Sequence, residues 1–243
     1  MNSISIIIPV LNEATQIGDA IRYLFRHSPV DQIMYTQSSG HTPIGIVEII
    51  VVDGGSTDDT RKIAASAGAV VITSAASRAV QMNAGAKVAK GNILYFVHAD
   101  TRPPATFTTD ILQAIEQGKD MGCYRYVFDR PDFLLKINAW FNRFSWLWCQ
   151  GGDKTFFIKK TLFDQLGGYN EQYVIMEEYD FLRRATSQYR LHTLPKYAIA
   201  SARKYEHNSW LRVQFANMLV FNLFRLGLAP VRLKKLYSRM IKK

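Results

Sequence analysis

Along the first hundred residues, nearly uninterrupted apolar runs alternate with segments whose apolar residues recur every three or four positions. The apolar runs are rich in β-branched side chains, which is typical of strands buried on both faces of a sheet. The runs occupy residues 3–10, 46–52, 70–72 and 93–97. The periodic segments predict helices over residues 15–25, 58–67 and 77–90. We therefore expect a mostly parallel sheet with right-handed crossovers.

The later part of the chain mixes the two patterns less regularly. It predicts helices at 106–117, 160–166 and from 175, strands at 121–128 and 155–158, and a long C-terminal helix. Polar, glycine and proline residues at 27–45 predict a long surface loop. Aromatic side chains recur at near-helical spacing between residues 133 and 148. We interpret this stripe as core packing in preference to a membrane- or acceptor-facing surface.

Two of the apolar runs end in an aspartate. Asp53 closes the run at 46–52, and Asp100 follows the run at 93–97, where Pro103-Pro104 keep the strand from continuing. The carboxyl ends of parallel strands meet at one edge of a sheet, where open α/β sheets bind ligands. A turn or helix cap is the competing interpretation of each aspartate, and we favour a shared site.

The turn after Asp53 adds a signature of anion binding. Gly54 and Gly55 allow a close approach of the backbone, and Ser56 with Asp59 matches the capping pattern that opens a helix. A strand, a Gly-Gly turn and a helix N-terminus together predict a platform for an anion or a nucleotide.

A third group of acids, Glu177, Glu178 and Asp180, opens a helix much later in the chain. Displacing a nucleotide diphosphate requires a carboxylate that holds Mg²⁺ or Mn²⁺, because these ions take oxygen ligands and bridge to phosphate oxygens. A second carboxylate must accept a proton from the incoming hydroxyl. Acids in a first turn also stabilise a helix without catalysis, and Glu178 has Arg183 and Arg184 as candidate partners.

Charge and composition narrow the range of partners. The 243 residues suit one domain, and their formal net charge of +10 implies attraction to nucleic acid, a membrane face or a phosphate-bearing small molecule. Arg78 and Arg203 are candidate phosphate ligands, although surface charge is the simpler interpretation of Arg203. Cys123 and Cys149 form no disulfide framework, which favours a reducing, cytoplasmic compartment.

The C-terminal region is both apolar and basic. Residues 211–230 form the most apolar window, but charged and amide side chains interrupt it, so it does not qualify as a spanning helix. Two interpretations stay open: an ordinary packing helix with a solvated basic tail, which we prefer slightly, and peripheral contact with an anionic membrane face or a lipid-linked acceptor.

Three ordered motifs stand out: Ile6-Ile7-Ile8-Pro9-Val10-Leu11-Asn12-Glu13, Val51-Val52-Asp53-Gly54-Gly55-Ser56-Thr57-Asp58 and His98-Ala99-Asp100. Together they resemble the motifs of family 2 glycosyltransferases with the GT-A fold, and the resemblance extends over residues 3–203. Other segments are similar to the arsenosugar-biosynthesis or radical-SAM-associated subgroup of that family. These are the residue ranges 77–86, 98–102, 152–153, 166–169 and 176–178.

The resemblance implies an α/β fold of the GT-A type, with a mostly parallel central sheet flanked by helices and a C-terminal helical extension. It implies inverting transfer of a sugar from a UDP- or GDP-linked donor to a hydroxyl group of a small-molecule or lipid-linked acceptor. The transferred group is expected to be a hexosyl group. The implied cofactor is a divalent cation, Mn²⁺ or Mg²⁺, and no nucleic-acid partner is expected. We expect one domain over 1–243: a nucleotide-binding half at 1–102, an acceptor half at 103–205 and basic amphipathic helices at 206–243.

Carried over residue by residue, the resemblance predicts a donor site. Pro9 and Glu13 would line the nucleoside pocket, and Asp53 would hold the base or ribose. Arg78 and Asn83 would lie near the diphosphate or donor sugar. The full predicted set is Pro9, Glu13, Asp53, Ser56, Arg78, Asn83, Ala99 and Asp100.

His98-Ala99-Asp100 stands at the family's DxD-type motif, which makes Asp100 the expected metal ligand, with His98 in place of the commoner aspartate as a second candidate. Glu178 stands where the family usually has an aspartate general base, and Asp180 is the alternative base. The remaining candidates, on the acceptor or phosphate side, are Asp153, Glu177 and Arg203.

Two other functions compete with glycosyl transfer. A sugar-phosphate nucleotidyltransferase also needs a sheet-edge carboxylate and a metal, but the chain has no early glycine-rich loop with a basic residue to grip a triphosphate. A non-catalytic nucleic-acid binder would fit the net charge, but the basic residues are dispersed or C-terminal and form no known reading module.

Overall fold

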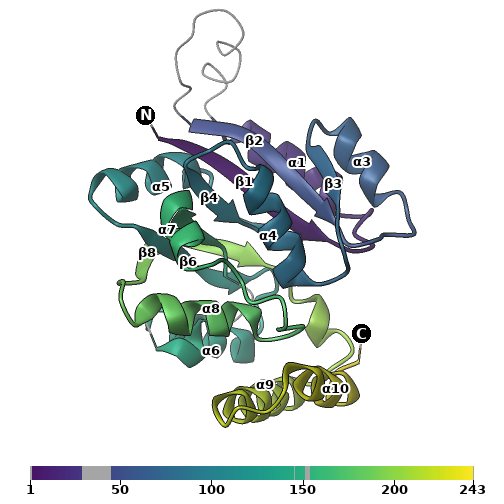
Figure 1. The fold of residues 1–243 in the computed structure, drawn as a ribbon. Coiled ribbons are helices and arrows are strands. Elements are labelled where there is room, and N and C mark those ends of the chain that lie inside the picture. The colour runs from purple at the N-terminus through teal and green to yellow at the C-terminus, as the bar shows by residue number, and fades with distance from the viewer. Residues whose placement is uncertain (1, 29–44, 145, 151–153, 243) are drawn as a thin grey trace, which may run out of the picture.

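The computed structural model describes residues 2–28, 45–144, 146–150 and 154–242, which form one eight-stranded sheet with helices on both faces (Figure 1). The strands are β1 (Ser3–Val10), β2 (Gly45–Asp53), β3 (Val70–Thr73), β4 (Ile93–Phe96), β5 (Thr101–Arg102), β6 (Met121–Phe128), β7 (Phe156–Lys159) and β8 (His192–Ala200). The helices are α1 (Ile17–Arg26), α3 (Thr60–Ser66), α4 (Arg78–Val88), α5 (Phe107–Glu116), α6 (Phe133–Phe141), α7 (Lys160–Gln165), α8 (Glu177–Thr186), α9 (Trp210–Arg225) and α10 (Pro230–Met240). Most of the loop expected at 27–45 lies outside the described residues.

The strand order is β3-β2-β1-β4-β7-β6-β8-β5. Strand β1 pairs in parallel with both β2 and β4, and β2 pairs in parallel with β3. Strand β7 runs antiparallel to β4 and β6, β8 runs parallel to β6, and β5 runs antiparallel to β8. The predicted α/β fold with a mostly parallel sheet flanked by helices is therefore confirmed.

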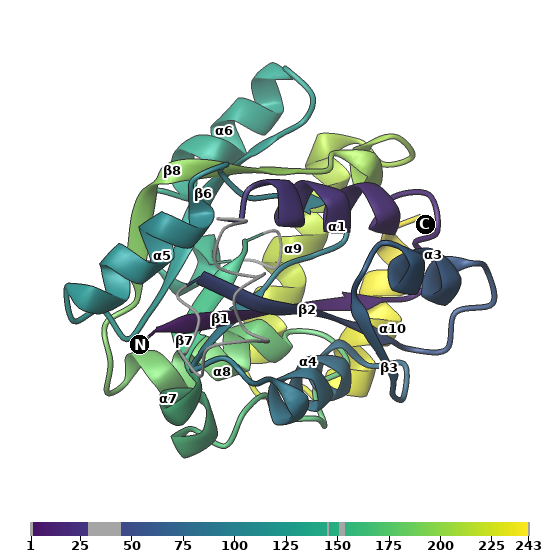
Figure 2. The same cartoon turned by 90° about the horizontal axis from the view of Figure 1, so that it is seen from above.

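The core is divided by the sheet into two layers. One face packs Ile4, Ile6 and Ile8 of β1 against α1, α3 and α5. The opposite face packs Ile7 with residues of β2 against α4, α7 and α8, and Figure 2 shows the two helix layers from above. Successive side chains of a strand point to opposite faces, so a central strand with both faces covered must be apolar almost throughout.

Strand β8 was missed because its sequence lacks a long apolar run. His192–Ala200 contains Pro195 and Lys196, which read as breakers of a strand. The pairing of β6 with β8 shifts register at this point: Tyr124 lies opposite Leu194, and Arg125 lies opposite Tyr197. Pro195 and Lys196 therefore fall in the irregularity, where a proline costs no ladder hydrogen bond.

Two expectations about the later chain are wrong in part. The aromatic stripe at 133–148 is only partly packed: Phe133, Trp140 and Trp148 are exposed, whereas Ile137, Phe141 and Phe144 are partly buried. The expected C-terminal helix ends at Arg225, and the basic residues after it form a second helix, α10, that packs against α9. None of the helices in the described part of the chain combines the length and apolar character needed to cross a membrane.

Gly91 tests how closely β4 must approach β1. A Cβ placed on Gly91 would lie 2.7 Å from the backbone nitrogen of Ser5 and 2.9 Å from the carbonyl carbon of Ile4. Because a backbone cannot rotate away as a side chain can, Gly91→Ala should lower the free energy of unfolding by about 1–3 kcal/mol in urea denaturation. The exposed neighbour Lys90→Ala should change it by less than about 0.5 kcal/mol, and equal effects of the two changes would refute the close approach.

Candidate functional site

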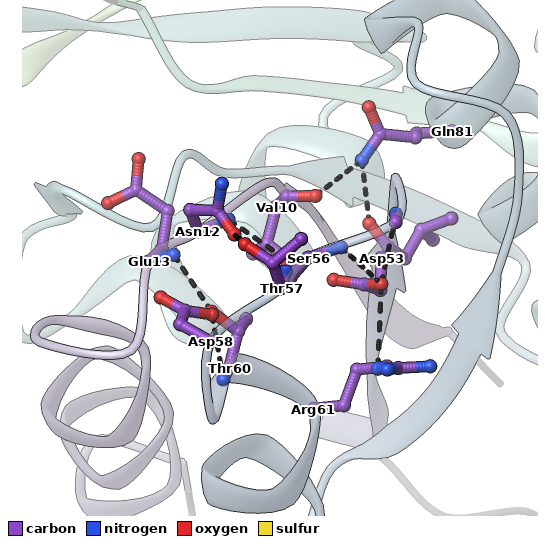
Figure 3. Close-up of polar contacts among 12 residues, drawn as sticks. Val10, Asn12, Glu13, Asp53, Ser56, Thr57, Asp58, Thr60, Arg61 and Gln81 are labelled. Carbon is purple, nitrogen blue, oxygen red and sulfur yellow. Dashed lines mark hydrogen bonds and ion pairs between the residues drawn. The ribbon is translucent and has the colours of Figure 1, made fainter.

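The carboxyl ends of β1 and β2 are tied together before any ligand contact is made. Val10 lies opposite Asp53 in the parallel ladder, and Gly54 N donates to Val10 O at 2.9 Å. From α4, Gln81 Nε2 donates to Val10 O at 2.9 Å and to Val52 O at 2.8 Å (Figure 3). The buried amide of Gln81 thus holds two strand ends at one place, a role that the sequence did not reveal.

The turn after β1 is fastened to the turn after β2. Asn12 has a left-handed backbone, with φ of 57°, which asparagine tolerates better than most residues. Its N–H donates to Ser56 Oγ at 2.8 Å, while its side-chain Oδ1 accepts from Thr57 N at 2.8 Å (Figure 3). Asn12 is a site residue that sequence reasoning passed over, although its place in a turn between a strand and a helix was a usable signal.

The predicted capping role of Ser56 is wrong. Its hydroxyl accepts from Asn12, whereas Asp58 caps the start of α3 by accepting from Thr60 N at 3.1 Å. Thr60 Oγ1 in turn accepts from Glu13 N at 2.8 Å. The loop after β2 therefore supports the loop after β1, and it places Ser56 and Glu13 at the shared sheet edge.

Asp53 is fully buried at the end of β2. Its Oδ2 accepts from Gly55 N and Ser56 N, both at 3.0 Å, and lies 3.8 Å from Arg61 Nε (Figure 3). Its other oxygen, Oδ1, is buried without a hydrogen-bond partner among the described residues. Buried acceptors almost always have a partner, so this oxygen is suited to a donor supplied by a ligand.

A second connection joins Glu13 to a segment far along the chain. Arg203 Nη2 donates to Glu13 Oε1 at 3.1 Å, and both side chains are partly exposed. The hydrogen bond to Glu13 raises the pKa of Arg203, burial opposes the rise, and the nearby carboxylates of Asp100 and Glu206 add to it. Arg203 is thus held near Glu13 and Asp100 at this end of the sheet.

The acids that open α8 lie beside the strand end that carries Asp100. His98 Nε2 lies 3.5 Å from Glu178 Oε1, and both side chains are largely buried. Arg78 Nη1, at the start of α4, lies 3.9 Å from Glu177 Oε1. Burial raises the pKa of the Glu177 carboxyl, which the charge of Arg78 opposes and that of Glu178 reinforces.

Two predicted site residues are engaged in holding the fold. Asp180 binds Arg183 Nη2 at 3.1 Å and Arg184 Nε at 3.0 Å, so both of its oxygens are occupied. Asn83 accepts from Tyr169 N at 2.9 Å and donates to Tyr169 O at 2.9 Å. Asn83 thereby attaches α4 to the turn after α7. Arg184, held by Asp180, donates to Leu166 O at 2.6 Å and Gly168 O at 2.7 Å and attaches α8 to the same turn.

The positions of the remaining predicted site residues add little to the description of the site. Pro9 is partly buried within β1, and Ala99 is buried beside Asp100. Asp153 lies outside the described residues. Next to it in sequence, Lys154 is buried, and its Nζ donates to Asn142 O at 2.9 Å and to Gln150 Oε1 at 2.8 Å. Burial lowers the pKa of Lys154. The side chains of Lys154 and Glu178 both line a cavity of about 20 Å³.

A metal site made by the protein alone is not present in the part of the chain that the structure describes, because no three His, Cys, Asp or Glu side chains come together there. Asp100 is partly exposed in the turn between β4 and β5, with Thr101 Oγ1 at 3.4 Å from its Oδ1. Mg²⁺ is commonly held by one or two carboxylates with substrate phosphates completing the shell. Asp100 fits that kind of site.

Comparison with known proteins decides the family. The model of Glycosyl transferase family 2 matches residues 5–172, which is more than half of the chain. This chain belongs to glycosyl transferase family 2.

Among its relatives, glycosyltransferase AglJ of Haloferax volcanii is 29% identical over 147 residues, covering 58% of this chain but only 42% of AglJ. Two solved structures share the fold. Mannosyltransferase PcManGT from Pyrobaculum calidifontis has a TM-score of 0.62 at 19% identity, covering 96% of this chain and 67% of that one. Glucosyl-3-phosphoglycerate synthase from Mycobacterium tuberculosis has a TM-score of 0.59 at 16% identity, covering 90% and 78%.

In this family 2 glycosyltransferase, Glu177→Gln should alter the pH dependence of stability. Between the ordinary pKa of 4.5 and the raised folded pKa, the native state keeps a proton that the unfolded chain has lost. The stability from this group is therefore full below 4.5 and is lost as pH rises through the folded pKa. Urea unfolding over a pH series should show that E177Q loses less stability than the wild type on going upward from 4.5.

The matched control for this prediction is Glu116→Gln, because Glu116 is exposed at the end of α5. The free energy of unfolding of E116Q, plotted against pH, should run parallel to that of the wild type. An E177Q curve that is also parallel would contradict the raised pKa of Glu177.

Proposed function

We propose that the chain is an inverting glycosyltransferase that moves a sugar from a nucleotide-diphosphate donor to a hydroxyl acceptor. The observation that carries the proposal is Asp53: one carboxylate oxygen is fixed by the Gly55-Ser56 turn, and the other is buried without a partner among the described residues. The structure of PcManGT, in complex with GDP-Man and Mn²⁺, and that of glucosyl-3-phosphoglycerate synthase, with Mg²⁺ and UDP, support a donor of this class.

On the donor side, Asp53 Oδ1 accepts a hydrogen bond from an N–H of the base or a hydroxyl of the ribose. Pro9 and Glu13 border the same strand ends, and the ion pair with Arg203 sets the direction of the Glu13 side chain. Arg78 supplies positive charge for the diphosphate or the donor sugar from the start of α4.

Asp100 is the proposed ligand of a divalent cation, Mg²⁺ or Mn²⁺. When bound, the cation offsets the negative charge that develops on the departing diphosphate. His98 is less suited as a ligand, because these ions prefer oxygen and His98 Nε2 faces Glu178.

Glu178 is the proposed general base. Its carboxylate takes the proton of the acceptor hydroxyl as the acceptor oxygen bonds to the anomeric carbon, and the bond from that carbon to the nucleotide diphosphate breaks with the electron pair leaving on the diphosphate. Attack from the side opposite the leaving group inverts the anomeric centre. His98 lies close enough to Glu178 to restrain its direction, whereas Asp180 is held by two arginines.

The acceptor is a small molecule in the simplest form of the proposal. A structure of glucosyl-3-phosphoglycerate synthase in complex with phosphoglyceric acid supports this class. The narrower resemblance to the arsenosugar-biosynthesis subgroup rests on the motifs around Arg78, His98 and Glu178, and it stays a prediction, as does a lipid-linked acceptor.

Nucleotide binding separates the roles of the two aspartates. In Asp53→Asn, the amide oxygen should keep the hydrogen bonds from the backbone N–H groups of Gly55 and Ser56. The amide NH₂ group then faces the ligand's donor and cannot accept its hydrogen bond. Binding of UDP or GDP should therefore weaken about 10- to 100-fold, with or without Mn²⁺. Asp100→Ala should remove only the gain in affinity that Mn²⁺ provides. Isothermal titration calorimetry measures both, with exposed Asp59→Asn as the matched control.

Failure of the wild type to bind UDP or GDP in the presence of either Mg²⁺ or Mn²⁺ would overturn the proposal. Release of pyrophosphate from a nucleoside triphosphate and a sugar phosphate would instead support the nucleotidyltransferase alternative.

Glu178→Gln removes the proton acceptor and keeps the size of the side chain. Because general base catalysis contributes about 10²- to 10⁴-fold, turnover should fall by that factor while donor affinity stays within about twofold. Release of UDP or GDP from a nucleotide sugar, with water as the acceptor, provides the assay. Glu178→Asp should keep part of the rate, and a fully active E178Q would exclude Glu178 as the base.

A further inference from the structure

Helix α9 carries an apolar stripe that faces away from the rest of the protein. Its buried residues are Val213, Ala216, Val220 and Phe224. The exposed apolar side chains are Leu211 at 72%, Phe215 at 54%, Met218 at 57% and Leu226 at 82% of their full accessible area. At 100° per residue, the exposed set centres on the side of the helix opposite the buried set. Exposed Asn222 and Arg225 lie on the same side of the helix, and Leu226 follows its last residue.

Helix α10, which packs against α9, carries exposed positive charge. It packs beside α9 through buried Leu233, and the two helices form a layer at one end of the molecule (Figure 1). Lys234, Lys235 and Arg239 are exposed on α10, together with apolar Val231. Residues 210–240 contain six basic side chains and no acidic one.

A second group of exposed apolar side chains adjoins the N-terminus of α9. Trp210 Nε1 donates to Asn138 Oδ1 of α6 at 3.2 Å, which places α6 beside this end of α9. Phe133 and Trp140 of α6 are exposed, as are Trp146 and Trp148 of the segment that follows it. Tryptophan is enriched where proteins meet the headgroup layer of a membrane.

We propose that the outward face of α9 and α10 docks on the surface of an anionic lipid bilayer. The stripe of Leu211, Phe215, Met218 and Leu226 enters the boundary between headgroups and acyl chains, and the basic side chains reach the lipid phosphates. A second copy of the chain is a poor occupant because its charge has the same sign. Each copy would bring six basic side chains and no acidic one to the interface, so the two faces would repel each other. The proposal is independent of the glycosyltransferase function.

Flotation with vesicles tests the proposal on the full chain. Vesicles of phosphatidylcholine with phosphatidylglycerol should bind the wild type at least tenfold more tightly than phosphatidylcholine alone, and added salt should weaken the binding. Phe215→Ser with Met218→Ser, and separately Lys234→Glu with Lys235→Glu, should each weaken binding at least tenfold. The matched controls are exposed Val88→Ser and the pair Lys87→Glu with Lys90→Glu, at the end of α4, which should bind as the wild type does.

Thermal unfolding and UDP or GDP binding, measured on the same variants, show whether each is folded, so a membrane result stays separate from a failure of the donor site. Equal affinity for neutral and anionic vesicles, no vesicle binding at low salt, or an equal loss in the Lys87–Lys90 control would overturn the proposal. A dimer in light scattering that the Phe215–Met218 variant converts to a monomer would assign the face to a second copy.

Discussion

The parallel pairing of β1 with both β2 and β4 is the constraint on which the site depends. Because β1 lies between them, the carboxyl ends of the strands that lead to Glu13, Asp53 and Asp100 point to the same edge. Burial of β1 on both faces fixes the register, since a slip of one residue would move the side chains of each face to the other. Gln81 then holds the ends of β1 and β2 at one point, so the acids inherit their positions from the core.

That rigidity allows the fold to keep a polar atom unsatisfied. A buried acceptor without a partner costs about 1–3 kcal/mol, which Asp53 Oδ1 incurs in the described structure. The turn around Asp53 is held by two backbone N–H groups, by the reciprocal bonds between Asn12 and the Ser56-Thr57 segment, and by the Asp58 cap of α3. A looser turn would rotate the carboxylate to satisfy both oxygens. In the proposed donor site, an acceptor whose direction is already fixed lowers the entropic cost of binding the ligand.

Features of the fold and the site that depend on the local sequence pattern could be predicted from the sequence, whereas those that depend on contacts between distant segments could not. The parallel strands were predictable because burial on both faces demands apolar runs, and the places of Asp53 and Asp100 followed from where those runs end. Strand β8 escaped because Pro195 and Lys196 lie in a register shift that only its pairing with β6 explains. The structural use of Asn83 and the exposure of Trp140 and Trp148 depend on which segments meet in space, and no local pattern in one chain records that.

The three acids that open α8 show why residue type alone cannot assign a role. Glu177, Glu178 and Asp180 occupy the same helical turn, and the macrodipole favours all of them equally. At 100° per residue they point in different directions: Glu177 toward Arg78, Glu178 toward His98, and Asp180 toward Arg183 and Arg184. The arginines occupy both oxygens of Asp180, and burial favours the protonated form of Glu177. A base must be free to reach a hydroxyl, and Glu178, whose carboxylate lies beside His98 and is not held by the arginines that bind Asp180, is therefore our proposed base.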